Sequence, residues 1–471
     1  MVIKEQYLTH TFSNFQLLFG GAYQKKSMQE QESYYNMYIY ILNMKSCYNL
    51  HIHIYLYTYT LYLYHIPPLY PFQHIPQKHP TKEEYLNFFK KMAKYHKNFI
   101  FTISLLLSYL SLSISYYDHH NKCSFPKECG KAKTSGMFVF GSSLVDNGNN
   151  NFFENRAKAD YLPYGMDFPN GPSGRFTNGK NIIDLLGEHL KLPIDFIPSF
   201  KDPSTKGLKI VNGVNHASAS SGILDDTGII AGNVTSLRQQ IKDFEEESLP
   251  ELENVLGCTT NDSLPNYLFV VGVGGNDIVF NYFLRKTYLT MDPPTFTKNL
   301  TVVLAQYIQK LYNLGGRKFV LTGVFPLGNY PLVKLNMPNC DFCVTLLNQA
   351  AQLFNTNLAS MVAQLRTQMP GSHFVIINTY NILNQILSDP APEGFINTTN
   401  SCCQVLSRLQ GGINGVVCER GGETCEDRNK YVYFDALHPT EAVNVLIANQ
   451  AYASHNKLMV FPINVQQLSQ F

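Results

Sequence analysis

The sequence carries almost no net charge. Its 37 lysines and arginines face 35 aspartates and glutamates, which gives a formal charge of +2. It also has no long basic run, no internal repeat and no tryptophan. The charge balance therefore gives no reason to expect nucleic acid or an acidic membrane surface as a partner. At 471 residues, the chain is long enough to bury a full core and to form more than one domain.

Zinc-ligand spacing is missing too, although the sequence has ten cysteines. One CxxC spans residues 340–343, and a second group consists of Cys402, Cys403, Cys418 and Cys425. A zinc site would need another CxxC or a histidine pair at matching spacing, and the sequence has neither. In an exported protein such cysteines are typical of disulfides. We therefore expect disulfides and no metal, with zinc ligation as the alternative.

The apolar run in "MAKYHKNFIFTISLLLSYLSLSIS", residues 92–115, is too short and too rich in serine for a membrane span, which needs about 20 apolar residues. It follows two lysines, extends over residues 99–112 and ends on Ser-Ile-Ser. This order is typical of a secretory signal peptide. We predict that translation starts at Met92 and that cleavage follows near Ser115, which leaves no stable membrane span in the mature protein. A single anchoring helix is the alternative.

Residues 1–91 lack the features of a domain. In "HIHIYLYTYTLYLYHI" tyrosine or histidine alternates with Ile, Leu and Thr, which is a strand pattern, but no partner strands are evident. We interpret this part as a biased leader outside the fold. The predicted organisation is therefore a leader over 1–91, a signal peptide over 92–115, a short linker over 116–134 and one domain over 135–471.

The predicted domain has four Asn-x-Ser/Thr sequons, which are relevant only if the protein is exported. Each can accept a glycan in the secretory pathway. The predicted glycosylation sites are Asn233, Asn261, Asn299 and Asn397. Together with the signal peptide and the cysteines, they predict a secreted, extracellular glycoprotein.

The domain alternates short apolar runs with helical stretches, which predicts an α/β fold. The expected strands are "MFVFG", "GVNHAS", "YLFVVGVGG", "KFVLTGVF" and "HFVIINTY". The expected helices are "NIIDLLGEHL", "SLRQQIKDFEE", "NLTVVLAQYIQKLYNL" and "CVTLLNQAAQLFNTNLASMVAQL". Continuous apolar strands between helices indicate a parallel sheet covered on both faces. In such sheets ligands bind beyond the carboxyl ends of the strands.

Polar residues at these strand ends could perform acyl transfer. Ser142 and Ser143 end the first strand, and Asn276 follows another. A serine hydroxyl needs a base and donors for the oxyanion that forms on attack. His438 is a candidate base, Asp435 could fix its tautomer, and the Asn276 amide could donate. Taken alone, each feature is also compatible with an ordinary turn with capping serines.

Four blocks in this order resemble the plant-type GDSL esterase/lipase family of the SGNH hydrolase superfamily. They are "FVFGSSLVDNGNN", "GVNHASASSGILDDTG", "VGVGGNDI" and "FDALHPTEAVN", and the resemblance covers roughly residues 136–458. It implies a three-layer α/β/α, flavodoxin-like fold with a central parallel sheet of about five strands. It also implies a cofactor-free esterase or lipase of the cell wall or apoplast. Its substrate would be a small-molecule or polymer ester, such as a lipid, a cutin-like ester or an acetylated wall ester.

The resemblance also assigns roles to residues. Ser143 is implied as the nucleophile, His438 as the general base and Asp435 as its orienting carboxylate. The oxyanion hole is implied to consist of the Ser143 N–H, a backbone N–H of the second block and the Asn276 side chain. The family often has "ASGGAGI" where this chain has "ASASSGI", so we choose Gly222, which keeps its match, as the second-block donor.

Ser142 departs from the family, whose block reads Gly-Asp-Ser-Leu. An aspartate there would accept backbone N–H bonds and hold the nucleophile loop, and charge-assisted bonds are roughly twice as strong as neutral ones. Its loss is expected to lower the rate on the order of 10- to 100-fold without removing a triad member. Restoring it by Ser142→Asp is therefore expected to raise kcat. An unchanged or lower kcat for this variant would refute the positioning role.

Two other readings compete with the esterase. A lipase-type α/β-hydrolase is disfavoured because the sequence has no Gly-x-Ser-x-Gly and because Asp435 and His438 lie on one loop. A non-catalytic secreted protein that keeps the fold and binds cell-wall esters or glycans is the alternative function. It is supported by Ser142 and by the altered second block.

Overall fold

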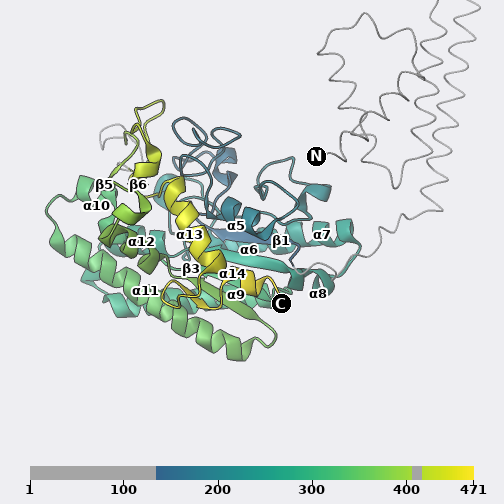
Figure 1. The fold of residues 1–471 in the computed structure, drawn as a ribbon. Helices are drawn as coiled ribbons and strands as arrows, with labels where there is room; N and C mark the ends of the chain where they lie inside the picture. The colour runs from purple at the N-terminus through teal and green to yellow at the C-terminus, as the bar shows by residue number, and fades with distance from the viewer. Residues whose placement is uncertain (1–133, 406–415) are drawn as a thin grey trace, which may run out of the picture. The chain divides into compact units, whose positions relative to one another are not determined.

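The computed structural model describes residues 134–405 and 416–471. These residues lie in one structural unit, Phe125–Phe471 (Figure 1). The predicted leader (1–91), the signal peptide (92–115) and the linker up to residue 133 lie outside the described residues. No helix in the described part is long and apolar enough to cross a membrane.

A five-stranded, mostly parallel sheet forms the centre of the described unit, as predicted. Its strands, in spatial order, are β1 (Gly136–Gly141), β2 (Tyr267–Gly272), β3 (Lys318–Thr322), β4 (His373–Ile377) and β7 (Val460–Pro462). The first four run parallel, and β7 pairs antiparallel with β4. Nearly every residue of the four parallel strands is buried, which explains why they appear as continuous apolar runs.

The predicted strand at 213–218 is not a regular strand of this sheet. It lies along the free edge of β1, where the His216 N–H donates to Val139 O and the Ser218 N–H donates to Gly141 O. It forms only isolated bridges, Asn215 with Val139 on one side and Asn215 with Ser199 on the other. The segment therefore extends the sheet edge and brings the second sequence block next to the end of β1.

Two groups of helices flank the sheet (Figure 1). In one group, α6 (Leu237–Asp243) and α11 (Asp341–Gln368) both pack on α9 (Pro293–Asn313). In the other, α5 (Ile182–Leu190) and α12 (Thr379–Ser388) both pack on α13 (Glu441–Ala453). The shorter helices are α7 (Leu249–Leu256), α8 (Thr260–Ser263), α10 (Pro331–Asn336) and α14 (Val465–Leu468). This arrangement confirms the predicted three-layer α/β/α fold.

Local sequence explains where the flanking helices begin. The Asn181 side chain accepts from the N–H groups of Ile183 and Asp184, and the Asp184 carboxylate accepts from the Asn181 N–H in return. This capping box satisfies donors that a helix start leaves open. Before α9, Asp292 accepts from the Thr295 N–H, and a proline follows at the first helical position.

Three disulfides join cysteines within the described residues, and Cys258 is disulfide-bonded as well, which confirms the disulfide prediction. The pairs are Cys340–Cys343, Cys402–Cys425 and Cys403–Cys418. The last two lie beside a small two-stranded sheet of β5 (Asn397–Ser401) and β6 (Tyr431–Tyr433). Within residues 134–405 and 416–471, no group of three or more His, Cys, Asp or Glu side chains could hold a metal ion.

Candidate active site

The nucleophile turn follows directly from β1. Gly141 ends this strand with φ of +148°, and a Cβ at this position would lie 2.3 Å from the carbonyl oxygen of Gly272 on β2. Only glycine combines this conformation with such a close approach. The chain therefore leaves the sheet sharply at Gly141, and Ser143 is placed half-buried beyond the carboxyl end of the strand.

The structure brings the three predicted catalytic side chains together. The Ser143 Oγ lies 2.7 Å from His438 Nε2, and His438 Nδ1 lies 2.7 Å from Asp435 Oδ2. Asp435 is fully buried and His438 is only 4% exposed. With Nδ1–H donating to the carboxylate, Nε2 is left as an acceptor for the serine O–H. The arrangement is that of a nucleophile, a base and a group that orients the base.

The loop that carries Asp435 and His438 is itself held by the carboxylate. Asp435 Oδ1 accepts from the N–H groups of Leu437 at 2.8 Å and His438 at 2.7 Å. The Phe434 N–H closes the loop by donating to the His438 carbonyl oxygen at 2.8 Å. The Phe176 ring lies 4.9 Å from the imidazole ring, centroid to centroid. These contacts restrict the imidazole to orientations that face Ser143.

A small cavity of about 10 Å³ adjoins the triad on the side of the second block. Ser143, Asn276, Ala219 and Ser220 are among its lining residues. Asn276 Nδ2 donates one hydrogen to Ser221 O at 2.9 Å, which orients the amide and leaves its second hydrogen free to donate. A cavity of this size holds about one water-sized atom, such as an oxyanion.

Gly222, predicted as the second-block donor, does not line this cavity. It packs against Asp277, and a Cβ at Gly222 would lie 2.4 Å from the Asp277 carboxylate. Glycine is therefore required there for packing. Ser220 is the second-block residue that faces the cavity, and it adopts φ of +68°, a conformation that favours glycine. Among the described residues, the backbone N–H groups of Ser143 and Ser220 have no hydrogen-bond partner.

Asp146 holds the nucleophile loop, a function that the sequence analysis assigned to an aspartate at position 142. Its buried carboxylate accepts from the N–H groups of Gly148, Asn149 and Ala219. Burial raises the Asp146 pKa to about 6, although these three bonds lower it. Ser142 is only 8% exposed and lines the larger cavity described below, and its own N–H donates to Gly272 O. The loop therefore has a carboxylate support despite Ser142.

Asp277 joins the third sequence block to the second. Its fully buried carboxylate accepts from the N–H groups of Ile223 and Leu224 and from the Thr227 hydroxyl. Burial raises its pKa to about 6, against the effect of these bonds. The turn that carries Asn276 is thereby fixed relative to the loop that carries Ser220.

A second, larger cavity of about 40 Å³ opens on the other side of Ser143 and His438. Its apolar lining residues come from the segments that follow β1, β2 and β3 and from the Asp435 loop: Leu144, Val273, Val279, Val324, Phe325, Leu327, Tyr330 and Leu437. Glycines at 272, 275 and 323 also line it, so the backbone forms part of the wall. The cavity lies where open α/β sheets bind ligands, beyond the carboxyl ends of the strands.

Residues 161–178 support the site, and this support was not predicted from the sequence. The Tyr164 hydroxyl lies 2.6 Å from Asp435 Oδ2, and the Thr177 hydroxyl donates to Pro439 O at 3.0 Å. The sequence feature that could have pointed to this support is "GRFTNG", residues 174–179. It is similar to the family's sequence there, but it contains no residue with an evident catalytic role. Its partners lie more than 260 residues away along the chain, so spacing could not reveal them.

Most of the described part of the chain is similar to known proteins. Residues 137–451 match the family described as GDSL-like Lipase/Acylhydrolase. The chain is 37% identical over 352 residues to GDSL esterase/lipase At1g29670 of Arabidopsis thaliana, covering 74% of this chain and 94% of that relative. It is 39% identical over 345 residues to GDSL esterase/lipase At1g71250 of the same plant, covering 72% and 90%.

Two solved structures are more distant. LAE5, an alpha/beta hydrolase enzyme from the metagenome of Lake Arreo, Spain, matches with a TM-score of 0.32 and 12% identity over 69% of this chain and 97% of that one. A catalytic mutant of Axe2, an acetylxylan esterase from Geobacillus stearothermophilus, matches with a TM-score of 0.31 and 10% identity over 68% and 92%.

Proposed function

The chain belongs to the GDSL-like lipase/acylhydrolase family of carboxylic ester hydrolases, and on that premise we propose that it cleaves its substrate through an acyl-enzyme on Ser143. One observation carries the proposal: Ser143 Oγ, His438 Nε2 and Nδ1, and Asp435 Oδ2 form a continuous chain with two links of 2.7 Å. A serine needs such a base to become a nucleophile near neutral pH.

The proposed reaction has two halves. Ser143 Oγ attacks the ester carbonyl while its proton passes to His438 Nε2, and Asp435 stabilises the imidazolium. The oxyanion enters the small cavity, where the N–H groups of Ser143 and Ser220 and the Asn276 amide donate to it. The alkoxide leaves with the proton from His438. Water then attacks the acyl-enzyme, giving its proton to His438, and the acid departs as that proton returns to Ser143.

The larger cavity limits the substrate, and we propose an ester of a short acyl chain. One water-sized atom needs roughly 10–15 Å³ of such a cavity. The cavity of about 40 Å³ is small, and we propose that it receives a short acyl chain, such as an acetyl to butyryl group. Its apolar side chains suit an acyl chain rather than a sugar or a charged group.

Hydrolysis of p-nitrophenyl esters of increasing acyl length tests this function. We expect kcat/KM to rise from acetate to butyrate and to stop rising between butyrate and octanoate, because each methylene that stays in water forfeits the gain of about 0.8 kcal/mol that burial would bring. Val279→Ala removes two methyl groups from the cavity wall, so it should raise kcat/KM for the octanoate ester relative to the butyrate ester. The control, Val302→Ala, changes an exposed valine and should leave this ratio unchanged. Equal rates for all chain lengths would contradict the short-chain proposal.

The same assay separates the esterase from the non-catalytic alternative. The alternative, a secreted ester- or glycan-binding protein of the same fold, requires that no ester be turned over at Ser143. Hydrolysis that disappears with this hydroxyl would contradict the binding protein. Binding of esters or glycans without any turnover would contradict the esterase.

We also propose that the protein is secreted to the cell wall or apoplast. Secretion is supported by the signal-peptide pattern at 92–115 and by the disulfides. Among the sequon asparagines, Asn233, Asn261 and Asn299 are exposed and open to a glycan, whereas Asn397 is half-buried. N-terminal sequencing of the native protein should find a mature chain that starts near residue 116. A start upstream of Met92 would overturn this part.

A further inference from the structure

Tyr164 has a hydroxyl group that lies between the disulfide region and the catalytic carboxylate. Its ring is fully buried. The hydroxyl donates to Asp435 Oδ2 at 2.6 Å and accepts from the Cys418 N–H at 3.1 Å. Both the donor and the acceptor capacity of the hydroxyl are therefore used.

This contact differs in kind from the other bonds of the carboxylate. Asp435 Oδ1 is held by N–H groups of its own loop, and Oδ2 also receives His438 Nδ1–H. Among the described residues, Tyr164 is the one hydrogen-bond donor to Asp435 that comes from another part of the chain. Other segments hold the backbone of this loop, as the Leu332 N–H does at Ala436 O, whereas Tyr164 holds the carboxylate itself.

We propose that Tyr164 is a positioning residue for the Asp435–His438 pair and that it ties this pair to the Cys403–Cys418 disulfide loop. The proposal rests on the proposed function, because it concerns the base that activates Ser143. The resulting chain runs from the Cys418 N–H through the Tyr164 hydroxyl to Asp435 Oδ2, His438 and Ser143 Oγ.

The packing around Tyr164 leaves its ring no room to turn away. Its ring meets Tyr161, Phe176 and Phe434 edge to face, with centroid distances between 5.4 and 5.7 Å. Such aromatic contacts favour fixed geometries. Phe434 precedes Asp435, and Phe176 contacts the His438 ring, so the same cluster packs on both members of the pair.

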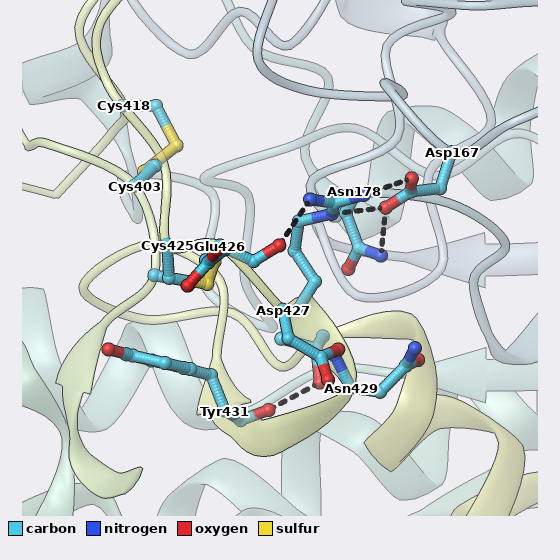
Figure 2. Close-up of a disulfide and its surroundings, with 12 residues drawn as sticks. Asp167, Asn178, Cys403, Cys418, Cys425, Glu426, Asp427, Asn429 and Tyr431 are labelled. Atoms are coloured by element: carbon cyan, nitrogen blue, oxygen red, sulfur yellow. Dashed lines mark hydrogen bonds and ion pairs between the residues drawn. A yellow bond between two sulfur atoms is a disulfide. The ribbon is translucent and has the colours of Figure 1, made fainter.

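The disulfide region is attached to the segment of Tyr164 at more than one point. The Tyr161 hydroxyl donates to Cys418 O at 2.8 Å, and Cys418 is bonded to Cys403. Arg428, just after Cys425, makes a two-pronged ion pair with Asp167, with both N–O distances at 2.7 Å. Figure 2 shows the Cys403–Cys418 disulfide and, to its right, Asp167 with Asn178 bonded to it. Tyr164 thus belongs to a segment held firmly against the disulfide loops.

The hydroxyl stays protonated and able to donate over the working pH range. Burial, reinforced by the charge of Asp435, raises the Tyr164 pKa well above its ordinary value. Two other tyrosines in the described part of the chain interact with Asp435: Tyr161, on the same segment, and Tyr330, before α10. Burial also raises their pKa values. Arg420 lies over the Tyr161 ring, where it pairs with Asp160.

Removing the hydroxyl should affect catalysis in two ways. Without the Tyr164 bond, Asp435 is less restrained, and His438 spends less time in line with Ser143. In addition, a carboxylate that has lost a donor holds the imidazolium more strongly, so the acid limb of the pH–rate profile should move to higher pH. A role confined to stability would lower the unfolding temperature and leave the limb where it is.

The test compares Tyr164→Phe with Tyr161→Phe in the full chain, using p-nitrophenyl acetate. Both variants lose one tyrosine hydroxyl that bonds Cys418, but only Tyr164 reaches Asp435. We expect Tyr164→Phe to lower kcat on the order of 10- to 100-fold, with KM changed by less than about two-fold and the acid limb displaced upward. Tyr161→Phe should keep kcat within about three-fold of the wild-type value and leave the acid limb of the pH–rate profile where it is.

Thermal unfolding of both variants keeps a folding defect apart from a positioning defect. Equal losses of kcat in the two variants, or a Tyr164→Phe enzyme with unchanged kcat and acid limb, would overturn the inference. If wild-type hydrolysis is lost in Ser143→Ala and Tyr164→Phe has no effect, only this inference fails. If wild-type hydrolysis survives Ser143→Ala, the proposed function fails and the inference fails with it.

Discussion

Replacing Ser143 by alanine is expected to lower kcat for a short-chain ester on the order of 10⁴-fold or more. The variant keeps Asn276, His438 and the cavities, but it has no oxygen at the position 2.7 Å from His438 Nε2. Any residual rate would come from water activated by His438 and from the oxyanion donors. Initial rates with p-nitrophenyl butyrate measure the effect, and the unfolding temperature of the variant should match that of the wild type.

Ser142→Ala is the matched control for this substitution. Ser142 precedes the nucleophile and lines the same larger cavity, but its hydroxyl has no hydrogen-bond partner among the described residues. We expect the Ser142→Ala rate to stay within about ten-fold of the wild type, since no charged or buried partner is left unsatisfied. A loss at position 142 as large as that at 143 would show that the register of the nucleophile has been assigned incorrectly.

Replacing Asp435 by asparagine is expected to lower kcat on the order of 10³- to 10⁴-fold with little change in KM. An asparagine oxygen can still accept the loop N–H groups that Asp435 holds, so the loop should fold. Its amide cannot stabilise the imidazolium, and its NH₂ favours the tautomer of His438 that has no acceptor for the serine O–H. The change therefore removes the electrostatic role and the correct tautomer together.

The control for this variant is Asp427→Asn. Asp427 also accepts a backbone N–H two residues on, from Asn429, but its side chain is 43% exposed, and it lies beside the disulfides. We expect its activity to equal that of the wild type, because surface substitutions of this kind rarely matter. Comparable activity in Asp435→Asn and the wild type would mean that His438 is oriented by another group.

The fold could be predicted where burial gives the sequence a continuous signal. The parallel strands β1 to β4 are apolar throughout because both faces of the sheet are covered, and the long helices α9 and α11 carry an apolar face. The edge strand β7 has three residues and ends on a proline, so it leaves no such signal. The segment at 213–218 has the apolar pattern of a strand, but it forms only isolated bridges, to Val139 and to Ser199.

The candidate site was predictable where its residues lie in ordered blocks and unpredictable where they meet only in space. Ser143, Asn276, Asp435 and His438 each follow an apolar run. The structure places Ser143, Asn276 and His438 at two adjoining cavities, with Asp435 buried behind His438. Tyr164 reaches Asp435 across 271 residues of sequence, which no spacing rule covers. The choice of Gly222 followed letter identity, whereas the cavity is lined by Ser220, two residues earlier.

The central claim is that Ser143 is the nucleophile that carries the acyl group. Its most direct test is to treat the native protein with an irreversible fluorophosphonate, which reacts with activated serines, and to locate the adduct by tandem mass spectrometry. We predict one adduct per chain, on Ser143 and not on Ser142, that is lost in an Asp435→Asn or Ser143→Ala protein. An adduct on Ser142, or a fully active protein that carries no adduct at Ser143, would contradict the account.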